Sequence, residues 1–245
     1  MLSSLLGMLR RAPRSALELV LPRLTEAAPD FTAADRALMA RVRPYTMTSI
    51  ERVTGLCNAV RYVVRSKIDG AIAECGVWKG GSMMSVALTL LELGELRDLY
   101  LFDTFEGMTP PTEEDVTYAG VTAAELLASP TGRMRLDAAM DQVRDAVAST
   151  GYPMDRVHFV PGRVEDTVPD RAPDRLALLR LDTDFYASTI HELAHLYPRL
   201  TTGGVLIIDD YGAWKGARQA VDEYFRDTAI LLNRLDWTGR LMVKR

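Results

Sequence analysis

The alternation of short apolar runs with stretches of helical periodicity is the strongest constraint on the fold of this chain. The apolar runs of strand length occupy residues 71–75, 99–102, 157–160, 176–181 and 205–208. Apolar side chains at helical spacing mark residues 52–66, 82–93, 134–148, 188–200 and 217–225. Strands that alternate with helices form a parallel sheet covered on both faces. With two last strands at 230–235 and 241–244, we expect one α/β domain around a mostly parallel seven-stranded sheet.

Composition narrows the class of protein. Of the 245 residues, 48% are hydrophobic, which is too many for a disordered chain. No stretch reaches the roughly 18 consecutive apolar residues of a membrane-spanning helix, and a net charge of −4 argues against a nucleic-acid partner. Two cysteines, Cys57 and Cys75, cannot form a disulfide framework. Cys75 lies in an apolar run, which favours a reduced thiol and a cytoplasmic location.

Two segments stand outside the alternation. Residues 1–24 have the pattern of an amphipathic helix, because Arg10, Arg11 and Arg14 follow the first apolar cluster instead of preceding it as in a secretory signal. We expect this helix to pack on the domain or on a second subunit, giving a homo-oligomer, rather than on a membrane surface. Residues 104–130 are rich in Pro, Thr, Glu, Asp and Gly and are too long for a plain connector, so we predict a lid over the active site.

The first two strands are followed by features typical of a nucleotide site. Glu74 precedes the glycine turn ECGVWKGGS, in which Gly76 permits a sharp turn and the following glycines let a ligand approach a helix N-terminus. The turn matches neither the dinucleotide fingerprint nor the P-loop. Asp103 ends the next strand, where such proteins place an acid that binds ribose hydroxyls, although an acid there can equally cap a helix.

Three aspartates at the ends of the fourth and fifth strands form the strongest chemical signal. Asp182 follows one strand, and Asp209 and Asp210 follow the next. The carboxyl ends of parallel strands share one edge of the sheet, and carboxylates gathered there need raised pKa values or a cation. Oxygen ligands of this kind suit Mg²⁺. The alternative is that Asp209 and Asp210 cap the following helix.

The sequence H-E-x-x-H at His191, Glu192 and His195 suggests a rival zinc site. Such a site needs a third ligand downstream, and no histidine follows His195, while Pro198 lies close behind. The spacing therefore favours an ordinary helix that covers the sheet.

Five motifs in order give the chain a family resemblance. The segments YTMTS, AECGVWKGGS, LFDTFEGM, LRLDTDFYAST and GGVLIIDDYGAWKGARQAVDEYF closely resemble those of the macrocin-type O-methyltransferases, which use S-adenosylmethionine to methylate sugar hydroxyls of macrolide and related antibiotics. The resemblance spans residues 45–225. It implies a Rossmann-like methyltransferase domain at 46–245. It covers neither the first 40 residues nor the interior of the lid, so the lid at 104–130 and an N-terminal helical cap at 1–45 remain expectations from the residue pattern.

The resemblance also implies roles for single residues. The metal ligands would be Asp182, Asp209 and Asp210, and Asp184 occupies the position of the family's general base. Phe185 stands where catechol O-methyltransferases carry a lysine. The cofactor would be contacted by Thr46, Met47, Glu74, Gly76, Ser82, Asp103, Phe105, Gly107, Arg163, Val164 and Asp182.

We therefore expect a Mg²⁺-dependent O-methyltransferase that acts on a sugar hydroxyl of a glycosylated natural product. A phenolic acceptor is one alternative. An NAD-dependent oxidoreductase is another, disfavoured by the missing dinucleotide fingerprint and by carboxylates that hydride transfer does not need. The predicted lid should select the aglycone through Met108, Tyr118 and Val121.

Overall fold

The computed structural model describes residues 30–129 and 136–245. The described residues divide into two units, with the boundary between residues 37 and 38. The described part of the first unit contains the first turn of α3 (Ala33–Val42). Thr32 and Asp35 cap this helix, since the Asp35 amide donates to Thr32 Oγ1 and the Thr32 amide donates to Asp35 Oδ2. The predicted amphipathic helix and its role in an oligomer fall on residues outside this description.

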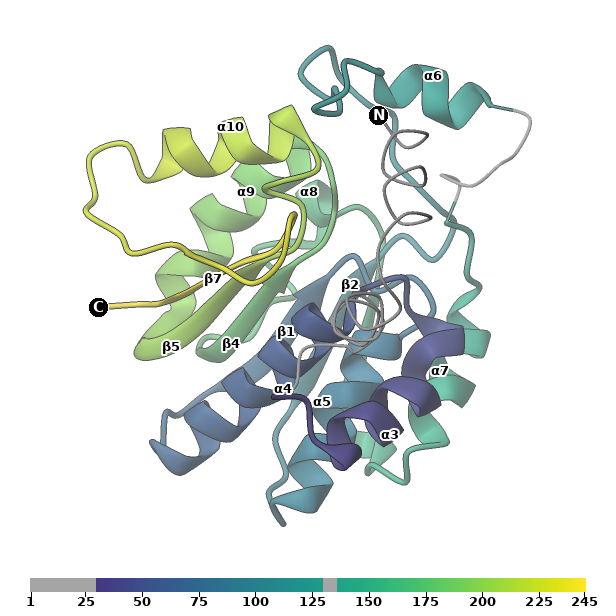
Figure 1. The fold of residues 1–245 in the computed structure, drawn as a ribbon, viewed down its shortest axis with the longest axis vertical. Helices are drawn as coiled ribbons and strands as arrows, with labels where there is room; N and C mark the ends of the chain where they lie inside the picture. The colour runs from purple at the N-terminus through teal and green to yellow at the C-terminus, as the bar shows by residue number, and fades with distance from the viewer. Residues whose placement is uncertain (1–29, 130–135) are drawn as a thin grey trace, which may run out of the picture. The chain divides into compact units, whose positions relative to one another are not determined.

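The second unit is built on a seven-stranded sheet with the strand order β3-β2-β1-β4-β5-β7-β6 (Figure 1). The parallel strands are β1 (Ala71–Cys75), β2 (Leu99–Asp103), β3 (Val157–Pro161), β4 (Leu176–Leu181) and β5 (Leu200–Ile208). β7 (Arg240–Val243) runs antiparallel to β5, and β6 (Asn233–Arg234) runs antiparallel to β7. The mostly parallel α/β sheet expected from the sequence is confirmed.

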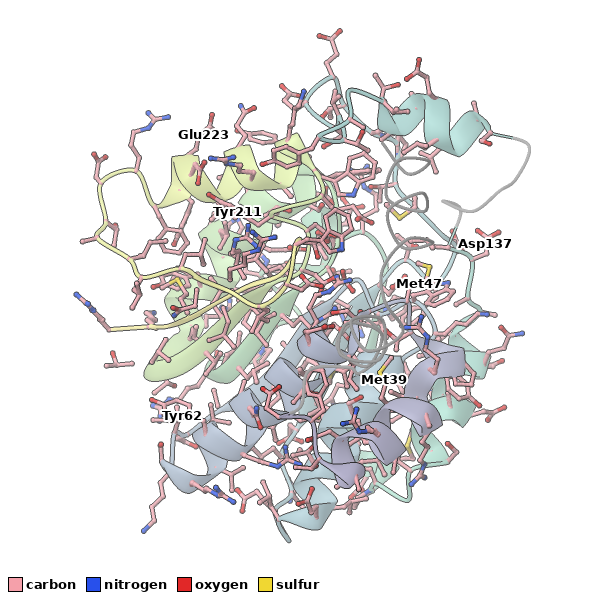
Figure 2. The ribbon with its side chains drawn as sticks, in the orientation of Figure 1. Met39, Met47, Tyr62, Asp137, Tyr211 and Glu223 are labelled. Carbon is pink, nitrogen blue, oxygen red and sulfur yellow. The ribbon has the colours of Figure 1, made fainter. Side chains whose placement is uncertain are left out.

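Helices cover both faces of the sheet (Figure 1). On one face lie α4 (Ile50–Arg65), α5 (Gly81–Glu92) and α7 (Met140–Ala148); on the other lie α8 (Val164–Thr167), α9 (Tyr186–Leu196) and α10 (Lys215–Tyr224). Successive strand residues point to opposite faces, so Ile72 joins the core beneath α4 and α5 while Ala73 joins the core beneath α9 and α10. Tyr62 on α4 points away from the sheet (Figure 2).

Several element boundaries differ from the sequence-based expectation. The helix expected to reach residue 200 ends at Leu196, and the 3₁₀ turn η3 (Tyr197–Arg199) takes its place because Pro198 has no N–H for helical bonding. β6 has two residues instead of six. Ile230 and Leu232 pack on the core beneath α9 and α10 and do not pair as part of a strand. Two further 3₁₀ turns are η1 (Arg43–Tyr45) and η2 (Met154–Arg156).

The helix expected over residues 134–148 begins at Met140, because Leu136 has a positive φ of 51° and Ala139 is extended. Among the described helices, none combines the length and the apolar character that crossing a membrane requires.

The predicted lid, as far as it is described, is fastened to the starts of α9 and α10. It holds one short helix, α6 (Ala123–Ala128), begun by a capping box of Thr122 and Glu125. Ala123 packs in a small apolar cluster with Phe185 and Trp214. Asp115 is fully buried and accepts hydrogen bonds from the amides of Thr112, at 2.7 Å, and Tyr186, at 2.8 Å. This carboxylate therefore ties the predicted lid to the first residue of α9.

Replacing Asp115 with Ala should loosen this attachment. The change removes the acceptor of two partly buried amides, and the loss of such hydrogen bonds to a charged group costs about 1–3 kcal/mol of unfolding free energy. We expect faster proteolytic cleavage within residues 104–129 and a lower midpoint of urea unfolding. Glu113→Gln, a change at an exposed carboxylate two residues away, is the control. Cleavage at the same rate in both variants would show that Asp115 does not hold the segment.

Candidate active site

A cavity of about 400 Å³ opens at the carboxyl ends of the parallel strands. Its lining includes residues 76–78 after β1, 102–104 at the end of β2, 162–165 after β3, 182–184 after β4 and 209–210 after β5. Because β1 lies between β2 and β4 in the sheet, the residues after β2 and β3 occupy one half of the cavity and those after β4 and β5 the other. This edge is where open α/β sheets bind ligands.

The glycine turn after β1 brings separate segments together. Gly76 has φ +80°, and a Cβ there would overlap the carbonyl oxygen of Asp182. A Cβ on Gly81, the first residue of α5, would overlap the backbone of Tyr45. Both glycines therefore let other backbone segments approach, so that Thr46, Ser82 and Asp182 all line one cavity.

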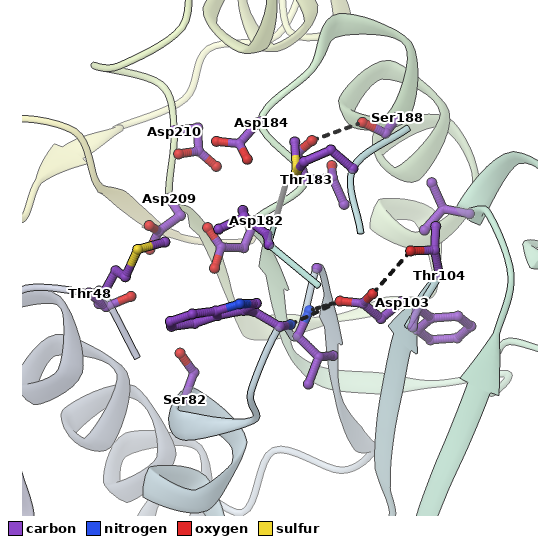
Figure 3. Close-up of a pocket in the computed structure, with 18 of the residues that line it drawn as sticks. Thr48, Ser82, Asp103, Thr104, Asp182, Thr183, Asp184, Ser188, Asp209 and Asp210 are labelled. Carbon is purple, nitrogen blue, oxygen red and sulfur yellow. Dashed lines mark hydrogen bonds between the residues drawn. The ribbon is translucent and has the colours of Figure 1, made fainter. Parts of the chain in front are cut away.

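The carboxylate of Asp103 accepts hydrogen bonds from the glycine turn after β1. Oδ2 accepts the amides of Val77, at 2.6 Å, and Trp78, at 2.9 Å, while Oδ1 accepts the amide of Phe105 at 2.8 Å. Thr104 Oγ1 makes only a long contact of 3.4 Å to Oδ1 (Figure 3). A carboxylate oxygen accepts about two hydrogen bonds, so Oδ1 is the oxygen with room for a ligand hydroxyl.

Asp182, Asp209 and Asp210 converge as the sequence predicts. Their ligand oxygens lie within 4.8 Å of one another, and in the part of the chain that the structure describes no other group of three His, Cys, Asp or Glu side chains does so. Figure 3 shows them on the side of the pocket opposite Asp103. Burial and the neighbouring carboxylates raise the pKa of Asp182 and of Asp210 well above the ordinary value.

A buried arginine on β4 organises this acidic cluster. Arg180, only 2% exposed, pairs with Glu74, with Asp182 at 2.6 Å and with Asp209. Its guanidinium also donates to Thr48 Oγ1 at 3.3 Å. A strongly buried cation is stable only among such partners.

A second arginine, Arg52 on α4, pairs with Asp209 and, at 3.0 Å, with Asp236. Asp210 Oδ2 is buried and has no hydrogen-bond donor among the described residues. The acids thus outnumber the two guanidinium groups, and an unsatisfied carboxylate oxygen remains. This donor set fits a divalent cation.

Asp184 stands beside the three converging aspartates without belonging to them. Its backbone has φ 66°, a left-handed conformation rare outside glycine. Trp214 Nε1 donates to its Oδ1 at 2.8 Å, which fixes the carboxyl group. Burial, together with the charge of Asp182, raises the pKa of Asp184 from 3.8 to about 7. In Figure 3 its carboxyl group lies next to that of Asp210.

Most of the residues expected to contact the cofactor line the cavity. These are Thr46, Met47, Gly76, Ser82, Asp103, Gly107, Arg163, Val164 and Asp182. Met47 lies at the rim with 59% of its surface exposed (Figure 2).

Glu74 and Phe105 are not part of this lining. The Glu74 side chain is turned to Arg180 and is almost fully buried, and Phe105 packs against Phe159 with ring centroids 6.1 Å apart. The side chains of Glu74 and Phe105 therefore lie outside the cavity in which the cofactor is expected.

Both alternative interpretations of the acidic and histidine motifs are wrong. The N-terminus of α10 has no side-chain cap, so Asp209 and Asp210 do not cap that helix. His191 lies 2.9 Å from the carbonyl oxygen of Val168, whereas Glu192 is buried and accepts from Thr183 Oγ1 at 3.2 Å. These two residues and His195 belong to α9, an ordinary helix that covers the sheet, as the spacing favours.

The sequence reasoning missed the two arginines and Trp214. A usable signal existed for Arg180 alone, because a charged residue within the apolar run Leu176–Leu181 conflicts with a buried strand unless it is paired. Among the expected lid residues, Met108 lines the cavity but Tyr118 and Val121 do not. Tyr118 instead accepts from Arg218 at 3.1 Å on α10.

Comparison with known proteins agrees with this geometry. Residues 19–244 match the family model Macrocin-O-methyltransferase (TylF). A curated relative from Streptomyces olivaceus, 8-demethyl-8-(2,3-dimethoxy-alpha-L-rhamnosyl)-tetracenomycin-C 4'-O-methyltransferase, is 36% identical over 84% of this chain and 79% of its own. Mycinamicin III 3''-O-methyltransferase from Micromonospora griseorubida is 34% identical over 74% and 70%. The solved structure of the O-methyltransferase NovP has a TM-score of 0.71 and 30% identity, covering 82% of each chain.

Glu74→Gln should make stability less dependent on pH. Burial raises the pKa of Glu74 from 4.5 to about 7 in spite of Arg180. The folded state thus retains a proton that the unfolded chain releases, and this carboxyl's stabilising contribution, complete below about pH 4.5, is lost as the pH rises through about 7. Denaturant titrations across this range should show a steeper fall in the unfolding free energy of the wild type than of the variant. Parallel curves would contradict the assignment, and Glu113→Gln should follow the wild type.

Proposed function

Because the chain belongs to the macrocin O-methyltransferase family, we propose that it transfers a methyl group from S-adenosylmethionine to a sugar hydroxyl of a glycosylated natural product. The convergence of Asp182, Asp209 and Asp210 beside Asp184, in a cavity at the strand ends, carries this proposal. The tetracenomycin relative is named as an O-methyltransferase of a compound with a rhamnosyl group, and the mycinamicin relative as a 3''-O-methyltransferase of mycinamicin III.

The cofactor fits the half of the cavity formed by β1, β2 and β3. Asp103 Oδ1 would accept a ribose hydroxyl, with Gly107 nearby in the lining. Arg163 and Val164, which follow β3, would border the adenine. Thr46, Met47, Gly76 and Ser82 would surround the methionine end. This arrangement directs the methyl group toward Asp182 and the acidic half of the cavity.

The acidic half suits a magnesium ion. Asp182, Asp209 and Asp210 would hold it, since their oxygens converge and Asp210 Oδ2 lacks another partner among the described residues. When bound, Mg²⁺ polarises acceptor hydroxyls and so lowers their pKa. Arg180 pairs with Asp209 Oδ1 and Arg52 pairs with Asp209 Oδ2, so both arginines hold this side chain in place.

Asp184 would act as the general base. The acceptor hydroxyl gives its proton to the Asp184 carboxylate while its oxygen forms a bond to the methyl carbon. S-adenosylmethionine would supply this methyl group as a sulfonium, whose sulfur would keep the electron pair of the broken carbon–sulfur bond in S-adenosylhomocysteine. Trp214 holds the base in one orientation, and Phe185 and Trp214 also support the predicted lid, which would exclude water from the reacting groups.

A direct assay tests the function and its phenolic alternative together. Incubation with S-adenosylmethionine and Mg²⁺ should methylate glycosides such as rhamnosides, detected as S-adenosylhomocysteine release and a methylated product. Methylation of a catechol without methylation of any glycoside would favour the phenolic acceptor instead. Family membership already sets aside the oxidoreductase alternative.

Asp103→Ala should weaken the binding of S-adenosylhomocysteine. The loss of hydrogen bonds to a charged acceptor costs at least ~1.5 kcal/mol, which is roughly tenfold in affinity. Titration calorimetry measures the change directly. Asp98→Asn is the control, because Asp98 directly precedes Leu99, at the opposite end of β2 from Asp103. Unchanged affinity in Asp103→Ala would remove Asp103 from the cofactor site.

Substitutions of Asp182 and Asp184 should fail in different ways. Asp182→Asn should weaken metal binding, so that excess Mg²⁺ restores part of the rate. Asp184→Asn should leave Mg²⁺ and cofactor affinity nearly unchanged yet lower turnover by roughly 10²–10⁴, the usual contribution of a positioned base. Calorimetric metal titrations and rate measurements at several Mg²⁺ concentrations separate the two. If Mg²⁺ restored the activity of Asp184→Asn but not that of Asp182→Asn, Asp184 would be the metal ligand and Asp182 the base. Full activity in EDTA would show that the reaction needs no divalent metal.

A further inference from the structure

Trp237 exposes a large apolar side chain at the rim of the cavity. It lies in the turn between β6 and β7 and is 66% exposed, although it belongs to the cavity lining. Trp237 and Met47 are the large apolar side chains of this lining with more than half of their surface exposed. An indole offers a broad apolar face to a ligand while losing little conformational freedom.

The turn that carries Trp237 is held from two directions. Asp236 Oδ1 accepts the amides of Thr238, at 2.9 Å, and Gly239, at 2.7 Å. Asp236 Oδ2 accepts Ser49 Oγ at 2.8 Å and lies 3.0 Å from Arg52 Nε. The contacts of Asp236 thus fix the backbone of the turn on which the exposed indole stands.

Gly212 holds the other side of the same turn. Its amide donates to the Thr238 carbonyl oxygen at 2.9 Å, and a Cβ on Gly212 would overlap the carbonyl oxygen of Trp237. Thr238 is buried, in contrast to its exposed neighbour. The exposure of Trp237 is therefore a property of a rigid turn, and such a preorganised surface binds with a small ordering cost.

The topology places Trp237 on the acceptor side of the cavity. Arg240 at the start of β7 pairs with Ile208 at the end of β5, so the turn lies at the carboxyl edge, beyond Asp209 and Asp210. Arg52 links the two regions, since it contacts both Asp209 and Asp236. The residues proposed for ribose and adenine follow β2 and β3, at the opposite end of the strand order.

We propose that Trp237 is a binding platform for the apolar group attached to the acceptor sugar. This inference rests on the proposed function: if the sugar hydroxyl lies at Asp184 and the three converging aspartates, the group joined to that sugar extends toward the rim, where the indole face meets it. Acceptor selection then depends on a fixed turn of the sheet, in addition to Met108 of the predicted lid.

Two glycosides that differ only in the attached group test the proposal. Methyl α-L-rhamnoside and 4-nitrophenyl α-L-rhamnoside share the sugar, but only the second carries an aromatic group. Steady-state rates with saturating S-adenosylmethionine and Mg²⁺ give KM for each, and calorimetry gives the Kd of S-adenosylhomocysteine. The wild type should have the lower KM for the nitrophenyl glycoside.

Trp237→Ala should remove this preference selectively. We expect KM for the nitrophenyl glycoside to rise about tenfold, equivalent to about 1.4 kcal/mol. KM for the methyl glycoside and the Kd of S-adenosylhomocysteine should stay within about twofold, as for a surface change away from their contacts. Trp237→Phe should keep most of the preference. Leu231→Ala is the matched control, because Leu231 is also 66% exposed but does not line the cavity.

The outcomes separate the platform from the function. If the wild type methylates both glycosides but Trp237→Ala raises both KM values equally, or Leu231→Ala has the same effect, the function stands and the platform is overturned. The same conclusion follows if the wild type shows no preference between the glycosides. If the wild type neither binds nor methylates either rhamnoside, the sugar-acceptor function fails and the platform proposal fails with it.

Discussion

The site depends on the buried guanidinium of Arg180. This one side chain contacts an acid on β1, an acid after β4 and an acid after β5, and it reaches Thr48 in the segment before α4. Its charge opposes the burial that raises the pKa of Glu74 and of Asp182. Because the three acids outnumber this one cation, the cluster keeps carboxylate oxygens of the kind that suit the proposed divalent ion.

The same pairing of acids with arginines extends outward from the sheet. Arg52 continues the network from Asp209 to Asp236, and Asp236 in turn shapes the turn that carries Trp237. The same ion pairs therefore connect the aspartates expected to face the acceptor hydroxyl with the turn expected to bind the group attached to the sugar. A change in either arginine would disturb both the oxygen ligands and the rim of the cavity, so single substitutions there are poor tests of either role.

The sheet and the converging aspartates were predictable from the sequence, because short apolar runs mark buried strands and parallel strands place their carboxyl ends at one edge. The role of Glu74 was not predictable, since it depends on register. Glu74 lies opposite Arg180 in the β1–β4 pairing, and no property of either residue's own segment reveals this. Trp237 was missed for a related reason, because the turn that carries it is held by a hydrogen bond that Asp236 accepts from Ser49, at the distant start of α4.

The predicted lid connects orientation of the base with coverage of the acceptor. Phe185 directly follows Asp184, Trp214 donates to the Asp184 carboxyl group, and both rings pack in the cluster that anchors α6. Asp115 adds a hydrogen bond from the same segment to Tyr186, two residues after the base. Any movement of the predicted lid must therefore either preserve these contacts or shift Asp184. The proposed closure over the acceptor and the alignment of the proposed base would thus be mechanically linked. The same contacts hold the Asp184 backbone in its left-handed conformation.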